Sequence, residues 1–464
     1  MDKYSKLLSN TVIFAIGTFS SKLLVFLLVP FYTRVLTTEQ LGTGDLIVNA
    51  ANLLIPVVSA GMANAIIRYG LDKSVRKSDV FTSGILVIFS GYLLFLLFRP
   101  LLDMIPILHQ HTLLIYIYVL TSCLRSLCAQ FVRARELVRL YAFDGILSTA
   151  TVILFNILFL LVFKLGILGY VLATICSDAL SALFLFWIAR LHRYLRLNRL
   201  DWSILGGMLR FSLPLIPTNM FWWITNVSDR YLVAWMINEG ANGLYAMSYK
   251  IPTMIILVSG IFTDAWQMSA ITENNRQRNQ FYSTVFSAYQ AIIFTAASGL
   301  ILCTKLISKI LFSKEFYSAW QYVPFLLIAT SFSCFVTFLG SIYMVEKKSM
   351  ATLITTVAGA VCNVLLNLLL IPEYGINGAA FATFISYLLV FLLRAIDTHR
   401  YVNIHWSAFK LLLNLVILLV QAFLLITQEE KWILPEILLC LVVVVLNLNQ
   451  LLLNVQKIFR KVLK

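Results

Sequence analysis

Charged residues are scarce in this chain of 464 residues: Asp, Glu, Lys and Arg make up 12% of it, whereas 60% is hydrophobic. Soluble globular domains carry about twice that share of charge. Apolar runs recur from one end of the sequence to the other, and no region is polar enough to form a separate soluble domain. The composition therefore predicts a single integral membrane unit.

Motifs of enzymes and motors are missing as well. The seven cysteines fall in or beside apolar runs without CxxC spacing, so we interpret them as small buried hydrophobic residues. The sequence contains no GxxxxGKS/T loop, no HExxH motif and no nucleophile elbow, which argues against an ATP-driven motor and against an enzyme. We therefore expect no catalytic residue, no cofactor, no metal and no nucleic-acid partner.

Fourteen apolar stretches are long enough to cross a bilayer, which takes about 20 residues. All are predicted to be helices, because a lone sheet cannot satisfy its backbone groups in lipid. The first stretch is too long for a signal-peptide core, so we expect it to stay in place as a helix. The predicted spans are 9–34, 43–66, 80–102, 112–132, 142–164, 167–190, 211–236, 244–268, 281–303, 322–345, 350–371, 376–394, 407–427 and 433–453.

The basic residues predict the orientation of these spans. With the N-terminus inside, most of the 36 Lys and Arg residues fall in inner segments, Arg394 and Arg400 among them. This asymmetry predicts that both termini are cytoplasmic, and it accounts for the net charge of +15 without nucleic acid. The longest basic inner stretch, 190–210, is predicted to be a helix at the membrane surface or a solvated connector.

An internal repeat divides the chain. GILGYVLAT at 166–174 returns as GINGAAFAT at 375–383, and TEQLGTGDLI at 38–47 has a weaker echo in NEGANGLYAM at 238–247. Such repeats predict an all-α polytopic membrane protein with two pseudo-symmetric six-helix lobes around a central cavity and two extra C-terminal helices. The predicted domains are the N-lobe 1–190, a basic linker 191–210, the C-lobe 211–394, and 395–464 with the last two helices and a tail.

Lysine occurs deep inside two of the spans. An ammonium at the position of Lys22 costs at least ~3 kcal/mol in lipid, so we expect Lys22 to face the protein interior or a water-filled cavity. The alternative is a lysine that packs or snorkels to the surface. Lys250 is similarly deep, and both lysines would line the cleft between the lobes. Cations that lack enough intramembrane acids to neutralise them indicate an anionic substrate.

Other ionisable residues within the spans are also candidate site residues. Arg125 lies in the fourth span and Asp178 in the sixth, while Asp229 and Arg230 lie late in the seventh. Arg125 has the alternative of snorkelling, and Asp229 that of balancing Arg230 at the membrane surface.

The eighth span carries Lys250, Asp264 and an internal proline. On a continuous helix, fourteen residues of separation place Lys250 and Asp264 within ~40° of one face. Pro252 in this span, and Pro30 in the first, predict bends in the helices that bear the two lysines.

Four stretches of the sequence resemble a known family. They are FSSKLLVFLLVPFYTRVLTTEQLGTGDLI at 19–47, FSLPLIPTN at 211–219, SDRYLVAWMINEGANGLYAMSYKIP at 228–252 and EYGINGAAFAT at 373–383. In this order they resemble the bacterial oligosaccharide-lipid flippases of the multidrug/oligosaccharidyl-lipid/polysaccharide exporter superfamily, which translocate O-antigen and capsule repeat units.

The resemblance implies a transporter of the bacterial cytoplasmic membrane that works by alternating access. Its cargo would be an undecaprenyl-diphosphate-linked oligosaccharide, carried from the inner to the outer leaflet for surface polysaccharide synthesis. A polymerase and glycosyltransferases would be possible partners. The implied cationic cavity residues are Lys22, Arg34, Arg125 and Lys250, with Asp229 and Arg230 in the signature of the seventh span. Asp178 and Asp264 are candidates for ion coupling.

Two other functions remain open. A cation-coupled exporter of small drugs belongs to the same superfamily, but its members often have an acid in the first helix, and this first helix has none. A membrane polysaccharide polymerase or ligase is expected to have a large outer loop with arginines and histidines. The outer loops predicted near 100–111 and 303–321 are short.

Overall fold

The computed structural model describes residues 26–104, 106–196, 200–272, 278–346, 348–428 and 432–462. Within these residues all regular secondary structure is helical. The thirteen predicted spans after the first coincide with a helix, with consecutive helices or with part of α17, and of the first span only residues 26–34 lie inside the described part of the chain. The all-α fold class is confirmed.

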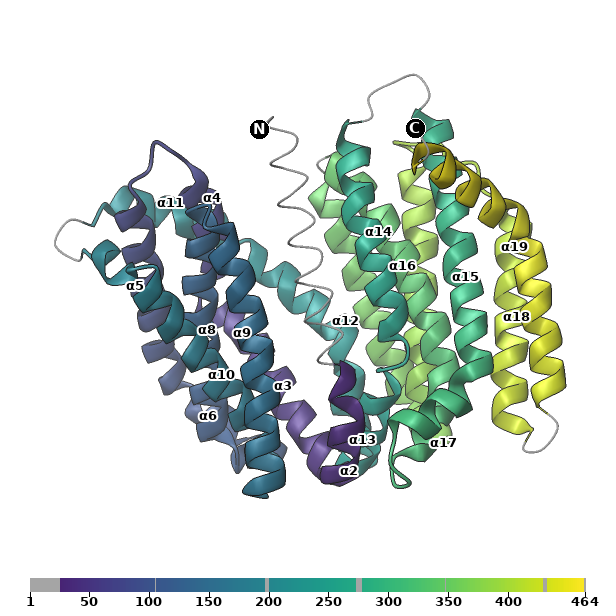
Figure 1. Cartoon of the computed structure of the whole chain (residues 1–464), viewed down its shortest axis with the longest axis horizontal. Coiled ribbons are helices and arrows are strands. Elements are labelled where there is room, and N and C mark those ends of the chain that lie inside the picture. The colour runs from purple at the N-terminus through teal and green to yellow at the C-terminus, as the bar shows by residue number, and fades with distance from the viewer. Residues whose placement is uncertain are drawn as a thin grey trace. The chain divides into compact units, whose positions relative to one another are not determined.

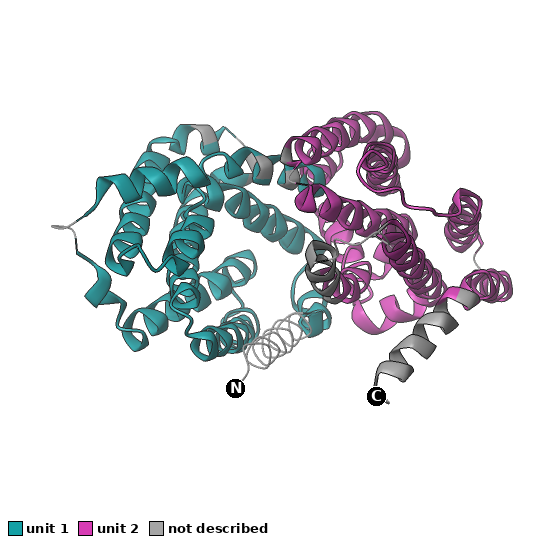
Figure 2. Ribbon diagram, turned by 90° about the horizontal axis from the view of Figure 1, so that it is seen from above, with its two compact units in different colours: residues 1–227 teal, residues 228–464 magenta. Residues whose placement is uncertain are grey.

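The chain forms two compact units, Met1–Val227 and Ser228–Lys464 (Figure 2). The boundary between them lies inside helix α12 (Leu215–Met236), so that the first half of α12 belongs to unit 1 and the second half to unit 2. These units are defined by packing, whereas the lobes predicted above are defined by a sequence repeat. The predicted lobe boundaries therefore stay a prediction.

Unit 1 is built around helix α8 (Thr112–Ala134), which packs against α3, α4 and α10 (Figure 1). Helix α3 begins with a capping box, in which Thr37 and Gln40 exchange hydrogen bonds between side chain and backbone. The other elements of unit 1 are α2 (Val29–Val35), α3 (Thr38–Val58), α4 (Met62–Leu71), α5 (Lys77–Leu97), α6 (Arg99–Asp103), α7 (Pro106–His109), α9 (Val138–Asn156), η1 (Ile157–Val162), α10 (Ile167–Ile188), η2 (Leu191–Tyr194) and α11 (Trp202–Ser212).

Unit 2 has helix α16 (Val323–Val345) at its centre. In its apolar window 78% of the residues are buried, against 28–50% in the other membrane-length helices, because α14, α15, α17 and α18 all pack on it. Phe332, Phe335 and Phe338 fill the space between these helices. The other elements of unit 2 are α13 (Glu239–Ser248), α14 (Thr253–Thr272), α15 (Arg278–Leu311), η4 (Tyr317–Tyr322), α17 (Ser349–Thr398), α18 (Ala408–Thr427) and α19 (Ile433–Val462).

Nine helices in the described ranges are long and apolar enough to cross a membrane. One of them is the apolar part of α17, whose 50 residues would extend for about 75 Å as a straight helix, more than twice the hydrocarbon thickness. Non-helical backbone at Gly375 interrupts α17 between the predicted eleventh and twelfth spans. The chain is therefore a multi-pass membrane protein.

The sequence predicted the helix break between α13 and α14 but not the one between α3 and α4. Residues 249–252 separate α13 from α14, so the predicted bend at Pro252 is confirmed. The predicted span 43–66, in contrast, is two helices. Residues 59–61 separate α3 from α4, with positive φ at Ala60 (48°) and Gly61 (65°).

The internal repeat has a matching backbone conformation in the two units. Gly166 has φ 56° and ψ −130°, and Gly375 has φ 57° and ψ −137°. Both angles belong to a region that side chains other than glycine rarely occupy. Gly166 ends a short non-helical stretch before α10, whereas Gly375 lies at the kink inside α17. The sequence repeat is therefore matched by the same backbone conformation at its first glycine.

Candidate functional site

Of the first two predicted cationic residues, Lys22 and Arg34, the structure describes only Arg34. Lys22 lies outside the described residues. Arg34 lies in the last turn of α2, where its side chain is exposed. A cation at this end of a helix is stabilised by the helix dipole.

Arg125 forms an ion pair inside unit 1. Its Nη1 atom on α8 donates to Oδ1 of Asp178 on α10 at 2.8 Å, and the hydroxyl of Ser122 donates to the other carboxylate oxygen. The side chain of Asp178 is 6% exposed and that of Arg125 is 31% exposed. The structure therefore brings two predicted site residues together, and the charge of Arg125 is balanced within the unit.

A second acid lies on the neighbouring helix. Asp144 on α9 is buried and accepts a hydrogen bond from the hydroxyl of Ser181 on α10. Further along the same interface, the hydroxyls of Thr151 and Ser177 share a hydrogen bond of 2.8 Å. Hydrogen bonds of this kind hold membrane helices together, each contributing roughly 0.6–2 kcal/mol. We call Arg125, Asp144 and Asp178 the unit 1 cluster.

Asp229 is the centre of a polar cluster in unit 2. Its fully buried carboxylate accepts hydrogen bonds from the hydroxyls of Tyr245 at 2.6 Å, Tyr249 at 3.0 Å and Thr383 at 3.2 Å. It also accepts the backbone N–H of Arg230 at 2.9 Å. The hydroxyls of Tyr245, Tyr249 and Thr383 enclose this carboxylate in the interior of unit 2, and the expectation that it balances Arg230 at the membrane surface stays a prediction.

Two buried amides on α17 extend this cluster. Asn363 accepts from Ser228 at 3.2 Å and from the Asn367 amide at 3.1 Å, while the Asn363 amide lies 3.4 Å from the Thr383 hydroxyl. The Oδ1 atom of Asn367 is buried and has no hydrogen-bond partner in the described part of the chain. We call Asp229, Tyr245, Tyr249, Thr383 and Asn363 the unit 2 cluster.

The donor set of the unit 2 cluster limits what it can bind. Carboxylate, hydroxyl and amide oxygens suit a proton or a hard cation. Transition metals prefer histidine and cysteine, and the described residues contain no group of three or more His, Cys, Asp or Glu side chains arranged to hold a metal.

Lys250 and Asp264 do not share a continuous helix. Lys250 lies in the break between α13 and α14, where it is half-buried, and Asp264 belongs to α14. The side chain of Asp264 is outside the described part of the structure. The continuous helix across Pro252 that this prediction assumed is wrong, and the common face of the two side chains stays a prediction. Arg230 lies nearby, with its guanidinium over the ring of Tyr249 at 5.1 Å.

Arg394 is a buried charge that the sequence analysis assigned to an inner segment. The side chain on α17 is 6% exposed and donates to the Val336 carbonyl at 2.8 Å and to the hydroxyls of Thr355 and Thr356, each at 3.1 Å. Among the described residues no carboxylate lies within ion-pair distance of it. The residue sits at the end of a predicted span, where hydropathy alone cannot separate a loop position from a buried one.

Glu436 is a second buried charge that the sequence analysis missed. It lies in the first turn of α19 and accepts from the Gln421 amide of α18 at 2.9 Å. The carbonyl oxygen of the same amide accepts from Ser298 of α15 at 2.8 Å. This chain of hydrogen bonds joins the C-terminal helix pair to the rest of unit 2. An acid in an otherwise apolar span was the signal for it.

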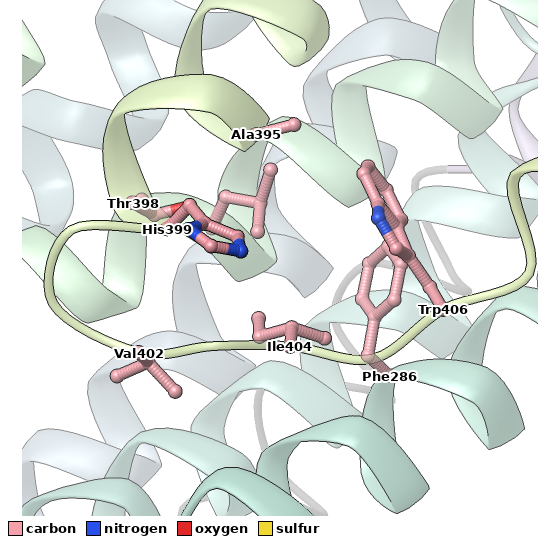
Figure 3. A pocket seen from close by; sticks show the side chains of 8 residues that line it. Phe286, Ala395, Thr398, His399, Val402, Ile404 and Trp406 are labelled. Carbon is pink, nitrogen blue, oxygen red and sulfur yellow. The ribbon is translucent and has the colours of Figure 1, made fainter.

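A small cavity of about 20 Å³ lies in unit 2 at the end of α17 (Figure 3). His399 and Trp406 lie on opposite sides of it, and Phe286 of α15 and Ile404 also line it. This volume suffices for about one water. The cavity is therefore a packing feature under the segment 399–406 and not a substrate site.

Known proteins share this fold and parts of this sequence. Residues 7–267 match the family described as polysaccharide biosynthesis protein, which is more than half of the chain. Lsg locus putative protein 1 of Haemophilus influenzae is 22% identical over 397 residues, which cover 81% of this chain and 95% of that protein.

Two solved structures have the same arrangement of helices. The lipid II flippase MurJ in an inward closed conformation matches with a TM-score of 0.70 and 16% identity, over 98% of this chain and 100% of that one. A multidrug resistance MATE family transporter of the MOP superfamily, in an inward-facing conformation, matches with a TM-score of 0.68 and 13% identity, over 82% and 95% of the two chains. With the fold of these transporters and a family match over more than half its length, the chain belongs to the polysaccharide biosynthesis protein family.

Proposed function

We propose that the protein is a flippase that moves an undecaprenyl-diphosphate-linked oligosaccharide from the inner to the outer leaflet of the bacterial cytoplasmic membrane. The observation that carries the proposal is a polysaccharide biosynthesis family match on a chain with a transporter fold. A sugar headgroup needs such a protein, because its hydroxyls lose their hydrogen bonds to water in the hydrocarbon.

In this proposal the cationic residues stabilise the diphosphate. Lys22, Arg34 and Lys250 replace water around its oxygens, with lysine acting as a point charge and arginine as a two-pronged donor. Arg125 joins them only in a state in which its ion pair with Asp178 opens, since that pair balances its charge in this structure. The isoprenoid chain stays in lipid throughout.

The basic inner segments support an orientation with both termini in the cytoplasm. The cargo then enters from the side on which glycosyltransferases assemble it and leaves on the side where a polymerase uses it. A reporter that is active only outside the cell, fused to the C-terminus, should remain silent. A signal from it would reverse the proposed direction.

Deletion of the gene in its host tests the function. The lipid-linked oligosaccharide should accumulate on the inner leaflet, and mass spectrometry of the extracted lipid would identify its sugars. Expression of the full chain should restore surface polysaccharide, whereas an equally abundant Lys22→Ala variant should not. Unchanged polysaccharide with altered drug sensitivity would favour a multidrug exporter. Product lengthening without leaflet transfer in purified vesicles would favour a polymerase.

A further inference from the structure

A cavity of about 110 Å³ lies in unit 1 at the break between α3 and α4. Its floor is apolar and consists of buried side chains of α4, α5 and α8, including Ile66, Ile88 and Leu127. The exposed side chains of Asn64 on α4 and Asn219 on α12 line it as well. An apolar floor with a few polar groups is the usual composition of a ligand pocket.

The helix break creates this space. At residues 59–61 the chain turns out of α3 through two consecutive positive φ angles, at Ala60 and Gly61, and starts α4 in a new direction. Helix α8 closes the cavity from the other side, where the thiol of Cys123 approaches the Ile55 carbonyl at 3.8 Å. A continuous helix over 43–66, as the sequence predicted, would not produce this break.

Four polar side chains around the cavity form no hydrogen bond within the described part of the chain. Ser59, Asn64, Ser126 and Asn219 all line it, and none of their side chains makes a hydrogen bond to another described residue. Ser59 is only 7% exposed, so the cavity is the main space in which its hydroxyl can meet a hydrogen-bond partner. Buried polar groups normally have partners, so the Ser59 hydroxyl is available to a ligand. Ser126 and the exposed Asn64 and Asn219 add further donors and acceptors at the cavity.

The lining also defines the ligand. Among the described residues no charged side chain lines the cavity, so this lining does not suit a diphosphate. Hydroxyls and amides both donate and accept, and they match a neutral group with the same capacity. At ~30 Å³ per water the volume holds about three to four waters, which is too little for a complete oligosaccharide. An acetamido or hydroxymethyl group of one sugar fits, with its carbon atoms against the apolar floor.

We propose that this cavity is a subsite for a neutral sugar substituent of the lipid-linked oligosaccharide. The inference rests on the proposed flippase function and adds to it that separate sites recognise the two parts of the headgroup. Cationic residues recognise the diphosphate, and an uncharged pocket at the α3–α4 break recognises the sugar. A glycerol headgroup of a membrane lipid has the same hydroxyl chemistry, so the test has to distinguish these two sources.

Binding of two lipids to the full-length protein in phosphatidylcholine nanodiscs tests the proposal. The probes are undecaprenyl-diphosphate-N-acetylglucosamine and undecaprenyl diphosphate, and the measured quantity is the ratio of their affinities. The wild type should favour the glycosylated lipid. Asn64→Leu and Asn219→Leu should each lower the ratio by about two- to tenfold, the effect of one lost hydrogen bond. Ala63→Trp, which fills the cavity instead of removing a donor, should lower it as well.

Asn403→Leu is the matched control, because Asn403 lies in the segment between α17 and α18 of unit 2, and it should keep the wild-type ratio. A wild-type ratio near one, or a ratio that survives all three cavity variants, would overturn the subsite but leave the flippase proposal standing. Failure of both lipids to bind would overturn both proposals. A repeat in nanodiscs that contain phosphatidylglycerol distinguishes a sugar ligand from a lipid glycerol headgroup. An unchanged affinity ratio supports the sugar. A ratio that falls to about one assigns the cavity to the glycerol headgroup.

Discussion

The buried charges of the two units have different kinds of partners. Arg125 in unit 1 forms an ion pair with an acid, Asp178, whereas Asp229 in unit 2 accepts hydrogen bonds from three hydroxyl groups and one backbone N–H and also interacts with the charge of Arg230. An ion pair that loses one member leaves a buried charge behind. A carboxylate held by hydroxyls leaves neutral donors without an acceptor when it is removed. The two sites should therefore respond differently to substitution.

We predict that the double variant Arg125→Leu/Asp178→Asn is more stable than the single variant Arg125→Leu. Arg125→Leu leaves the Asp178 carboxylate uncompensated, which should cost about 2–4 kcal/mol because Arg125 is itself only partly exposed. Adding Asp178→Asn removes the orphan charge and should recover most of this loss. Thermal unfolding of the purified variants in detergent measures both steps.

Polysaccharide export by the same two variants shows whether Arg125 only stabilises the fold or also takes part in transport. If Arg125 only stabilises unit 1, the double variant exports normally once it is stable. If Arg125 contacts the diphosphate, the double variant remains defective despite its recovered stability. A double variant no more stable than Arg125→Leu would contradict the role of the ion pair.

At Asp229 we predict a difference between an isosteric and an apolar substitution. Asp229→Leu leaves Tyr245, Tyr249 and Thr383 without their common acceptor, at a cost of about 1–3 kcal/mol for each buried group that finds no other partner. Asp229→Asn keeps one acceptor oxygen and should be much less destabilising. Melting temperatures of the two variants provide the comparison, and equal losses would show that the hydroxyl bonds contribute little.

Among the elements, the interruption of α17 offers a clean test of backbone strain. Gly375 has φ 57°, and a Cβ atom added there would meet nothing within 4 Å. The cost of Gly375→Ala is therefore conformational alone, and we expect about 1–3 kcal/mol of destabilisation. Gly299 in α15 also has open space for a Cβ but no positive φ. Gly299→Ala should be neutral or stabilising by up to about 1 kcal/mol. Two equally tolerated variants would contradict the repeated glycine turn.

The helices were predictable from the sequence because hydropathy accumulates over about 20 residues and does not depend on neighbours. The breaks were predictable only where a strong signal marked them. Pro252 marked the one between α13 and α14, whereas the turn at Gly61 lies inside a long apolar run and was missed. Packing also favours glycine there, since a Cβ atom added at Gly61 would lie 3.1 Å from the carbonyl oxygen of Ser212 in α11.

The candidate site was less predictable than the helices. A charge in an apolar run can be read directly, so Arg125 and Asp178 were both found. Their pairing depends on how α8 and α10 pack across 53 residues of sequence, which no local pattern contains. Arg394 was assigned to an inner segment because a residue at a span end has the same local sequence whether it is buried or solvated.

For the whole molecule, the charge of the proposed cargo predicts a response to membrane potential. Moving negative charge out of a compartment that is negative inside is downhill by ~2.3 kcal/mol per charge per 100 mV. In proteoliposomes with a fluorescent undecaprenyl-diphosphate-sugar, an inside-negative potassium diffusion potential should raise the fraction in the outer leaflet. The opposite potential should lower it, and each 1.4 kcal/mol changes the leaflet ratio tenfold.

Two controls show whether transfer requires the protein and whether the response to the potential requires a charged lipid. Vesicles without protein should show no transfer, and a fluorescent phosphatidylcholine without net charge should not respond to the potential. A leaflet ratio that ignores the potential, while transfer still requires the protein, would mean that the diphosphate crosses with compensating cations. The unit 2 cluster around Asp229 would then be the first place to seek such a cation, because its oxygen donors suit a proton or a hard ion.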